Sequence, residues 1–155
     1  MKTWQRILVV IVLLGIGVTV GFIKLFQGQR VNASSVMNLH QISLGLLMYT
    51  DDYNNRFPDL SDPLSLKKAV AIYLNKDASQ TERFFVHPKT GKPYEPNSPL
   101  SYQERKGPNA SAGIAVIYED EPSGDGTRGV LFGDCHVERV TESRWQDLKK
   151  SSHIS

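Results

Sequence analysis

The sequence predicts an α+β fold in which one long N-terminal helix packs on a small antiparallel β-sheet. Two features predict the helix: residues 7–23 form an uncharged apolar run, and residues 36–53 carry apolar side chains at spacings of three and four. A third feature predicts the sheet, because short apolar segments alternate with glycine- and proline-bearing loops in the second half of the chain. The chain divides into an anchor at 1–26, an amphipathic helical continuation at 27–56 and a small α+β domain at 57–155 with a C-terminal hairpin.

Residues 1–26 are predicted to form a single-pass transmembrane anchor. Most residues from 7 to 23 are Ile, Leu, Val or Phe, and with Leu25 and Phe26 the run reaches about 20 residues, or about 30 Å of helix, which spans a bilayer. Lys2 and Arg6 precede the run, so the N-terminus is expected inside the cell. We therefore expect an inner-membrane protein whose C-terminal domain is periplasmic or extracellular.

A cleavable signal peptide is the alternative interpretation of the apolar run. Val31-Asn32-Ala33 would place small side chains at positions −3 and −1 of a cut after Ala33. That site lies about ten residues beyond the apolar run, and the run is long for the core of a signal peptide. The sequence therefore favours an anchor that stays attached.

The distribution of charge gives no ground for nucleic-acid binding. The formal net charge is +2, and three of the 18 lysines and arginines, namely Lys2, Arg6 and Lys24, flank or end the apolar run. Without these three, the 16 acidic residues outnumber the basic ones, and no cluster of Lys and Arg is interleaved with aromatic residues. The lone Cys135 excludes an intrachain disulfide framework.

The amphipathic continuation at 27–56 is predicted to present one apolar stripe to the domain. Asn54-Asn55 and then Pro58 are expected to end the helix. Gly45 lies inside the helix, where it would let a strand approach closely. The stripe consists of apolar and aromatic residues at helical spacing: Val36, Leu39, Ile42, Leu46, Tyr49 and Tyr53.

The remaining residues, 57–155, predict two short helices and several strands. Asp62 can cap a helix that has Pro63 at its first position and continues to about residue 74. Thr141 can cap a final helix that has Trp145 and Leu148 on one side. Strands are predicted at 83–86, 100–102, 113–119, 130–132 and 137–140.

Two details of these strands are also predicted. In the segment 113–119, simple alternation would place Ile114, Val116 and Tyr118 on one face of the sheet. Between the last two strands, Gly133-Asp134 is predicted to form a two-residue hairpin turn.

The rear of the long helix resembles that of type IV pilin-like proteins, including the pseudopilins of type II secretion systems. The resemblance is carried by residues 38–42 (Asn-Leu-His-Gln-Ile), 46–49 (Leu-Leu-Met-Tyr), 52–53 (Asp-Tyr) and 57–58 (Phe-Pro). Together with the apolar run it covers about a third of the chain. It implies a long helix, half in a membrane or filament and half packed on an antiparallel sheet, with a structural or assembly role. It also implies other pilin-like subunits as partners through the N-terminal helix.

Two departures from this family pattern limit what the resemblance implies. The first six residues lack the Gly-Phe-Thr-Leu-Ile-Glu string at which such proteins are cut and assembled, so we expect no processing by a prepilin peptidase. Residues 129–140 resemble the C-terminal hairpin of one branch, which has a His ten residues before the Asp of an Asp-Gly pair. Here Gly124 stands in place of that His, and Cys135 replaces the Gly.

No catalytic, cofactor or metal site is predicted, and we expect no enzymatic activity. Cys135 and His136 would point to opposite faces if both lay in a strand, so they cannot act as a nucleophile and base. Calcium could find oxygen ligands in Asp120, Glu121, Asp125 and Asp134, but their spacing matches no EF-hand loop. Close Cys and His ligands for zinc are absent from the sequence near His87.

The function predicted from the sequence is that of a membrane-anchored, pilin-like structural or assembly protein of a secretion or pilus-type system. The alternative is a standalone membrane-anchored binding module outside the cytoplasm that captures a ligand through the loops at 75–112. The predicted partners are the membrane and other pilin-like subunits, and no nucleic acid or cofactor is expected.

Overall fold

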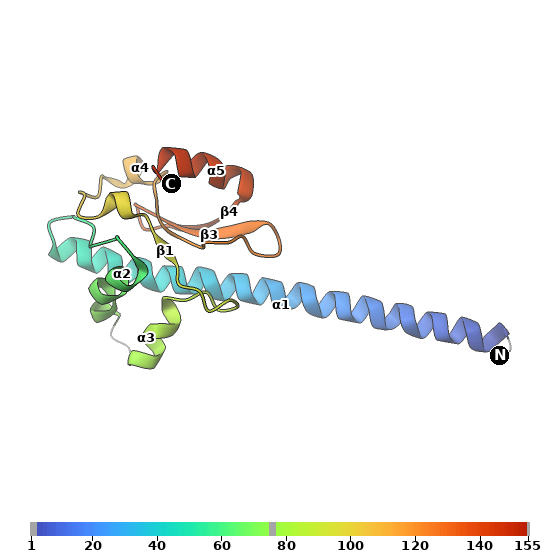
Figure 1. The fold of residues 1–155 in the computed structure, drawn as a ribbon. Helices are drawn as coiled ribbons and strands as arrows, with labels where there is room; N and C mark the ends of the chain where they lie inside the picture. The colour runs from blue at the N-terminus through green and yellow to red at the C-terminus, as the bar shows by residue number, and fades with distance from the viewer. Residues whose placement is uncertain (1–2, 75–76, 155) are drawn as a thin grey trace.

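The computed structural model has an α+β fold with one long helix and a four-stranded antiparallel sheet (Figure 1). It describes the backbone of residues 3–74 and 77–154, and side chains at Thr19, Ile23 and from residue 26 onwards, apart from Pro108 and the backbone gaps. The long helix, α1, spans Thr3–Asp52. The strands are β1 (Glu95–Pro96), β2 (Ala115–Tyr118), β3 (Thr127–Phe132) and β4 (Val137–Thr141), and they lie in sequence order.

Only the rear of α1 is covered by the domain, and its front part runs past it (Figure 1). Leu39, Ile42 and Leu46 of the predicted stripe are fully buried against the sheet. The helix ends where the sequence predicts, because Asn54 and Asn55 adopt the left-handed conformation with φ of 53° and 60°. Tyr53, the last residue of the predicted stripe, lies just beyond the end of α1 and is 51% exposed.

The predicted transmembrane span stays a prediction. Among the residues whose side chains are described, no helix is long and apolar enough to cross a membrane. The apolar run from residue 7 to residue 26 and the first six residues fall almost wholly outside that part of the chain.

The sheet separates two apolar cores. On one face, Leu131 of β3 packs with the buried stripe of α1, and on the other face Val130 and Phe132 pack with the C-terminal helix α5 (Glu142–Ser151). Thr141 caps α5, as predicted, by accepting a hydrogen bond from the backbone N–H of Arg144. The sheet therefore lies between α1 and α5 (Figure 1).

Trp145 and Leu148, which the sequence placed on one side of the final helix, are both buried in the second core. The guanidinium of Arg128 lies 4.6 Å from the centre of the Trp145 ring and pairs with Glu142 at 2.9 Å. This cation–π contact and ion pair join β3 to the first turn of α5.

Two short helices pack on α1, and they correct the role predicted for Gly45. Asp62 caps α2 (Pro63–Val70), which continues as the 3-10 helix η1 (Ala71–Tyr73), as the sequence indicated. A Cβ at Gly45 would lie 2.6 Å from Val70 Cγ1 and 3.1 Å from the Val70 carbonyl oxygen. Gly45 therefore admits a helix rather than the predicted strand.

The predicted strands at 83–86 and 100–102 are wrong. Residues Ala78–Phe84 form the helix α3, which Asp77 caps, and only Val86 makes an isolated β-bridge, to Pro93. Residues Ser98–Leu100 form the 3-10 helix η2, followed by a turn. A polar N-cap explains the first case, because the Asp77 side chain accepts a hydrogen bond from the backbone N–H of Gln80 and starts a helix that reaches Phe84.

A β-bulge corrects the faces predicted for β2. The register of β2 against β3 shifts between Ala115 and Ile117, so Val116 and Ile117 both pack in the core beneath α1. Ala115 and Tyr118 pack on the α5 side instead. The extra residue breaks the alternation that the sequence pattern assumes. One further short helix, α4, spans Pro108–Ser111.

The β3–β4 hairpin turns over three residues rather than the predicted two. The backbone N–H of Phe132 donates to the carbonyl of His136 at 2.9 Å, which leaves Gly133, Asp134 and Cys135 in the turn. Cys135 has a φ of 72°, in the left-handed region that favours glycine. The third residue of such a turn needs this conformation, which is strained for a cysteine.

We expect Cys135→Gly to stabilise the protein by about 1 kcal/mol, because glycine removes the cost of a side chain in the left-handed region. Denaturant unfolding of the full-length protein in detergent would measure the gain. Cys135→Ala removes the thiol and keeps the strain, so it should give no such gain. The reverse change, Gly126→Ala at a φ of 75° with open space around it, should destabilise. A loss of stability in Cys135→Gly would contradict this account.

Candidate functional site

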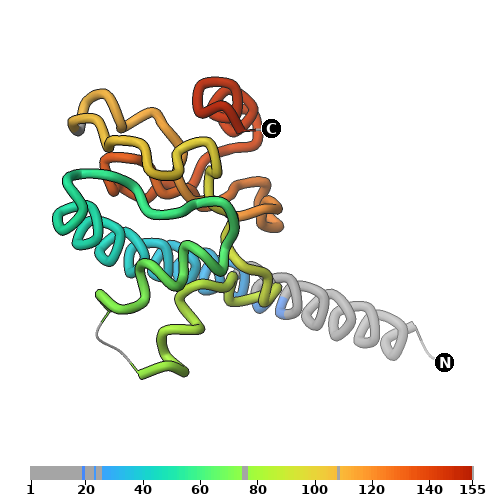
Figure 2. The backbone as a smooth tube through the Cα atoms, turned by 60° about the vertical axis from the view of Figure 1, so that its left-hand side comes forward, coloured from blue at the N-terminus to red at the C-terminus, as the bar shows by residue number. Residues whose placement is uncertain are grey.

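A cleft of about 1140 Å³ lies where α1 leaves the domain. Its walls are residues 27–32 of α1, the turn at 87–93 and the loop at 119–125. The turn lies beside α1 in both views (Figures 1 and 2). The cleft thus brings together parts of the chain that are far apart in sequence.

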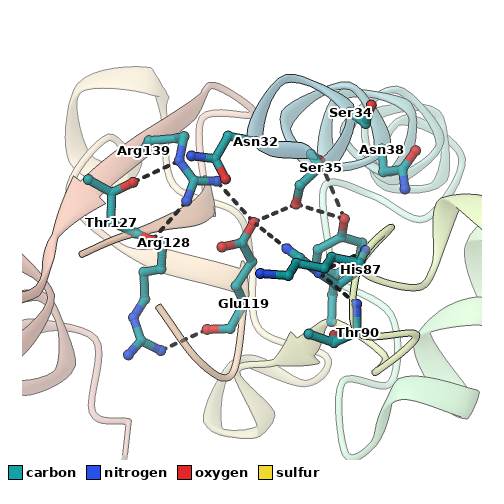
Figure 3. A network of polar contacts seen from close by, with 12 residues as sticks. Asn32, Ser34, Ser35, Asn38, His87, Thr90, Glu119, Thr127, Arg128 and Arg139 are labelled. Carbon is teal, nitrogen blue, oxygen red and sulfur yellow. Dashed lines mark hydrogen bonds and ion pairs between the residues drawn. The ribbon is translucent and has the colours of Figure 1, made fainter. Parts of the chain in front are cut away.

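The floor of the cleft is a buried carboxylate, that of Glu119, whose side chain is only 2% exposed. Its Oε1 accepts a hydrogen bond from Ser35 Oγ at 2.5 Å and one from Arg139 Nη1 at 3.1 Å, and lies 3.7 Å from His87 Nε2 (Figure 3). Ser35 Oγ in turn lies 2.9 Å from Tyr94 Oη. Burial raises the pKa of Tyr94 to about 12, so its hydroxyl stays protonated at neutral pH. We call these five residues the Glu119 network.

Local backbone structure places Glu119 at this point. It directly follows β2, and its N–H donates to the carbonyl of Gly129 on β3 at 3.0 Å. A Cβ at Gly129 would lie 2.8 Å from Leu39 Cδ1 and 2.9 Å from Glu119 Oε1. The missing side chain of Gly129 therefore makes room for the carboxylate between the sheet and α1.

His87 forms one side of the Glu119 network, and its tautomer follows from its contacts. The backbone N–H groups of Lys89 and Thr90 both lie 3.3 Å from His87 Nδ1, so this nitrogen is the acceptor. The proton of the neutral ring is then on Nε2, which faces Glu119. Burial lowers the pKa of His87, and the Glu119 carboxylate only partly opposes this effect.

The stability of the protein should depend on the protonation of His87. Because the folded-state pKa lies below the ordinary value of about 6.5, the unfolded chain binds a proton more readily. The stabilisation is therefore complete above about pH 6.5 and declines as the pH falls through the lower folded-state pKa. We expect His87→Gln to flatten the fall in unfolding free energy between about pH 7 and pH 5.

Equilibrium unfolding at a series of pH values would check this result. His40 is exposed on α1, so His40→Gln is the matched control and should leave the pH dependence unchanged. Parallel curves for His87→Gln and the unmodified protein would contradict the expected role of His87.

The two walls of the cleft are tied to each other and to α1. Lys92 Nζ contacts Glu121 Oε1 at 2.6 Å and Asp120 Oδ2 at 3.8 Å, so the turn and the acidic loop are joined. Lys92 lowers the pKa of Glu121, which raises the pKa of Lys92 in return. Asn32 on α1 donates to Asp125 at 2.7 Å.

The four acidic residues that could supply calcium ligands do not converge on one point. Asp120 and Glu121 pair with Lys92, whereas Asp125 contacts Asn32, Thr127 and Arg139. Asp134 lies in the hairpin turn and contacts His136. Within the described residues, no group of three or more His, Cys, Asp or Glu side chains is arranged to hold a metal ion.

Cys135 and His136 have separate partners, although the reason differs from the predicted one. Cys135 lies in the hairpin turn, and His136 lies between that turn and the start of β4 at Val137. His136 stacks on Phe132 at 4.2 Å, and Arg105 Nη1 lies 3.8 Å from Cys135 Sγ. Burial raises the pKa of the Cys135 thiol, which disfavours the reactive thiolate.

The sequence patterns did not predict the Glu119 network. In the sequence, Ser35 lies one residue before the apolar stripe, and Glu119 is the last residue of the strand predicted at 113–119, after which an acidic loop follows. The position of Ser35, a polar residue at the edge of the apolar stripe, was the one sequence feature that indicated a buried polar partner.

Comparisons with protein-family models, with characterised proteins and with solved structures gave no match. The chemistry of the cleft therefore rests on the residues of this chain. Its floor offers a carboxylate beside a neutral imidazole, and its rim offers side chains of both charges. This arrangement is suited to binding a polar group.

Proposed function

We propose that this protein is a membrane-anchored, pilin-like structural or assembly protein, with its N-terminus inside and its domain outside the cytoplasm. The observation that carries the proposal is the division of α1. The domain covers only the rear of this helix, and the apolar run occupies the part that extends beyond it (Figure 1). A helix of this kind can hold a domain at a membrane and still offer its front half to other helices.

The continuity of α1 supports an anchor that stays attached. The helix runs without a break through Ala33, after which a signal peptidase would cut. Asn32 just before that point contacts Asp125, and Ser35 just after it belongs to the Glu119 network. Cleavage would therefore remove one wall of the cleft, although the buried stripe of the helix would remain.

Membrane fractionation of the full-length protein tests the anchor. We expect the protein to stay in the inner-membrane fraction after alkaline extraction, at the mass of the intact chain. Protease added from the outer face should digest the domain and spare the extreme N-terminus. A soluble form that begins near Ser34 would overturn the anchor.

Isolation from membranes in mild detergent tests the assembly role. Co-purification with other pilin-like or secretion-system subunits is the expected result. Loss of those subunits on substitution within the front half of α1, with the domain still folded, would place the contact on that helix. Purification without any such subunit would count against assembly.

A standalone anchored binding module is the second candidate function, and the cleft is the observation that favours it. The turn at 87–93 belongs to the loops at 75–112 through which a ligand was expected to bind. In that case the protein would act without other pilin-like subunits. Their co-purification would therefore argue against this function.

A further inference from the structure

The cleft at residues 27–32, 87–93 and 119–125 holds polar atoms that the protein leaves without partners. Glu119 Oε2 and Ser123 Oγ are buried and make no hydrogen bond within the described structure, and both residues line the cleft. Nearly all buried polar atoms in proteins are paired. These two atoms therefore favour a ligand that carries a hydroxyl or ammonium group.

Two positive charges at the same cleft are also unpaired. Arg30 on α1 and Lys89 in the opposite turn are exposed and line the cleft, and neither has an acidic partner among the described residues. Lys92 offsets one of the two negative charges of Asp120 and Glu121. Arg30 and Lys89 add two positive charges that are not engaged with these acids. The mouth of the cleft can therefore attract an anionic group such as a phosphate.

The position of the cleft along α1 connects it with the membrane. Residues 27–32 directly follow Phe26, where the apolar run ends. Six helical residues cover about 9 Å, slightly more than the roughly 5–7 Å of polar headgroup layer on one side of a bilayer. With the anchor in place, the cleft would therefore open at the level of the lipid headgroups.

We propose that this cleft binds the headgroup of a phospholipid from the leaflet in which the anchor ends. Arg30 and Lys89 contact the phosphate, and Glu119 and Ser123 contact the hydroxyl or ammonium group of the headgroup alcohol. A cleft of about 1140 Å³ is large enough for such a group. The inference rests on the proposed anchoring, and it deepens that function by giving the domain a fixed contact with the membrane surface.

Native mass spectrometry of the full-length protein, released from membranes in mild detergent, tests the proposal. We expect the unmodified protein to retain a phospholipid and Arg30→Ala/Lys89→Ala to retain about tenfold less, because two charge-assisted contacts to the phosphate are lost. Lys68→Ala/Lys106→Ala is the matched control, since both lysines are exposed on other surfaces. Equal retention in the two double variants would overturn the proposal.

A substitution that leaves the charge unchanged distinguishes a specific headgroup site from general attraction to an anionic surface. Ser123→Ala removes a neutral group from the cleft and should also lower retention. Retention at the unmodified level in Ser123→Ala, combined with a loss in Arg30→Ala/Lys89→Ala, would show surface attraction alone and overturn the site.

Experiments in nanodiscs show whether the bound phosphate belongs to a lipid or is free phosphate. They also test headgroup binding independently of the membrane anchor. We expect phosphatidylglycerol to raise the unfolding temperature of the domain in the unmodified protein and not in Arg30→Ala/Lys89→Ala. The same rise with inorganic phosphate in phosphatidylcholine nanodiscs would overturn the lipid assignment. Failure of the protein to float with vesicles would instead refute the anchor, whereas flotation without lipid retention would refute only the headgroup site.

Discussion

Glu119→Ala should destabilise the folded protein by about 3 kcal/mol, which we expect to be the largest effect of a single substitution in the Glu119 network. The side chain is 2% exposed and its Oε1 receives hydrogen bonds from Ser35 and Arg139. Removing it leaves the guanidinium of Arg139, which is 17% exposed, with the exposed Asp125 carboxylate 3.9 Å away as its remaining acidic partner. An uncompensated buried charge costs more than the ion pair itself contributes.

Denaturant unfolding of the full-length protein in detergent, followed by tryptophan fluorescence, would measure this loss. Trp145 reports on the second core because it is buried beneath Arg128. Glu119→Gln keeps the shape and one acceptor for Ser35, so its cost should be intermediate. Glu121→Ala is the exposed control and should have a small effect. A cost for Glu119→Ala no greater than that for Glu121→Ala would contradict the network.

Gly45→Ala and Gly28→Ala should change stability in opposite directions, although they are the same substitution in the same helix. A Cβ at Gly45 would lie 2.6 Å from Val70 Cγ1 and 3.0 Å from Leu74 Cδ2, while the space around Gly28 is open. Overpacking costs about 1–3 kcal/mol, and the gain in helix propensity of about 1 kcal/mol offsets only part of it. We expect a net loss of up to about 2 kcal/mol at Gly45.

At Gly28 only the helix propensity changes, so a gain of up to about 1 kcal/mol is expected. Urea unfolding of the two variants side by side would measure the difference. Val70→Ala removes the side chain nearest to the new methyl group, so the cost of Gly45→Ala should be smaller in that background than alone. A stabilising Gly45→Ala would show that α2 does not contact α1 as closely as the structure shows.

The long helix and its end could be predicted because their causes are local. Apolar residues at helical spacing, the left-handed pair Asn54-Asn55 and the caps Asp62 and Thr141 each act within a few residues of the chain. For the same reason the hairpin of β3 and β4 was found in outline. Its turn length was not, because a third residue in the left-handed conformation is expected to be glycine and here it is Cys135.

The sequence by itself determined the α+β class, the long N-terminal helix and the position of several caps, since periodicity and capping depend on near neighbours. Only the tertiary structure decided which element meets Gly45, which β2 residues share a face and which charges meet in the cleft. Ser35 and Glu119 are 84 residues apart, and they meet only because α1 and β3 pack where Gly129 has no side chain. Contacts at such separation depend on packing, which no local pattern encodes.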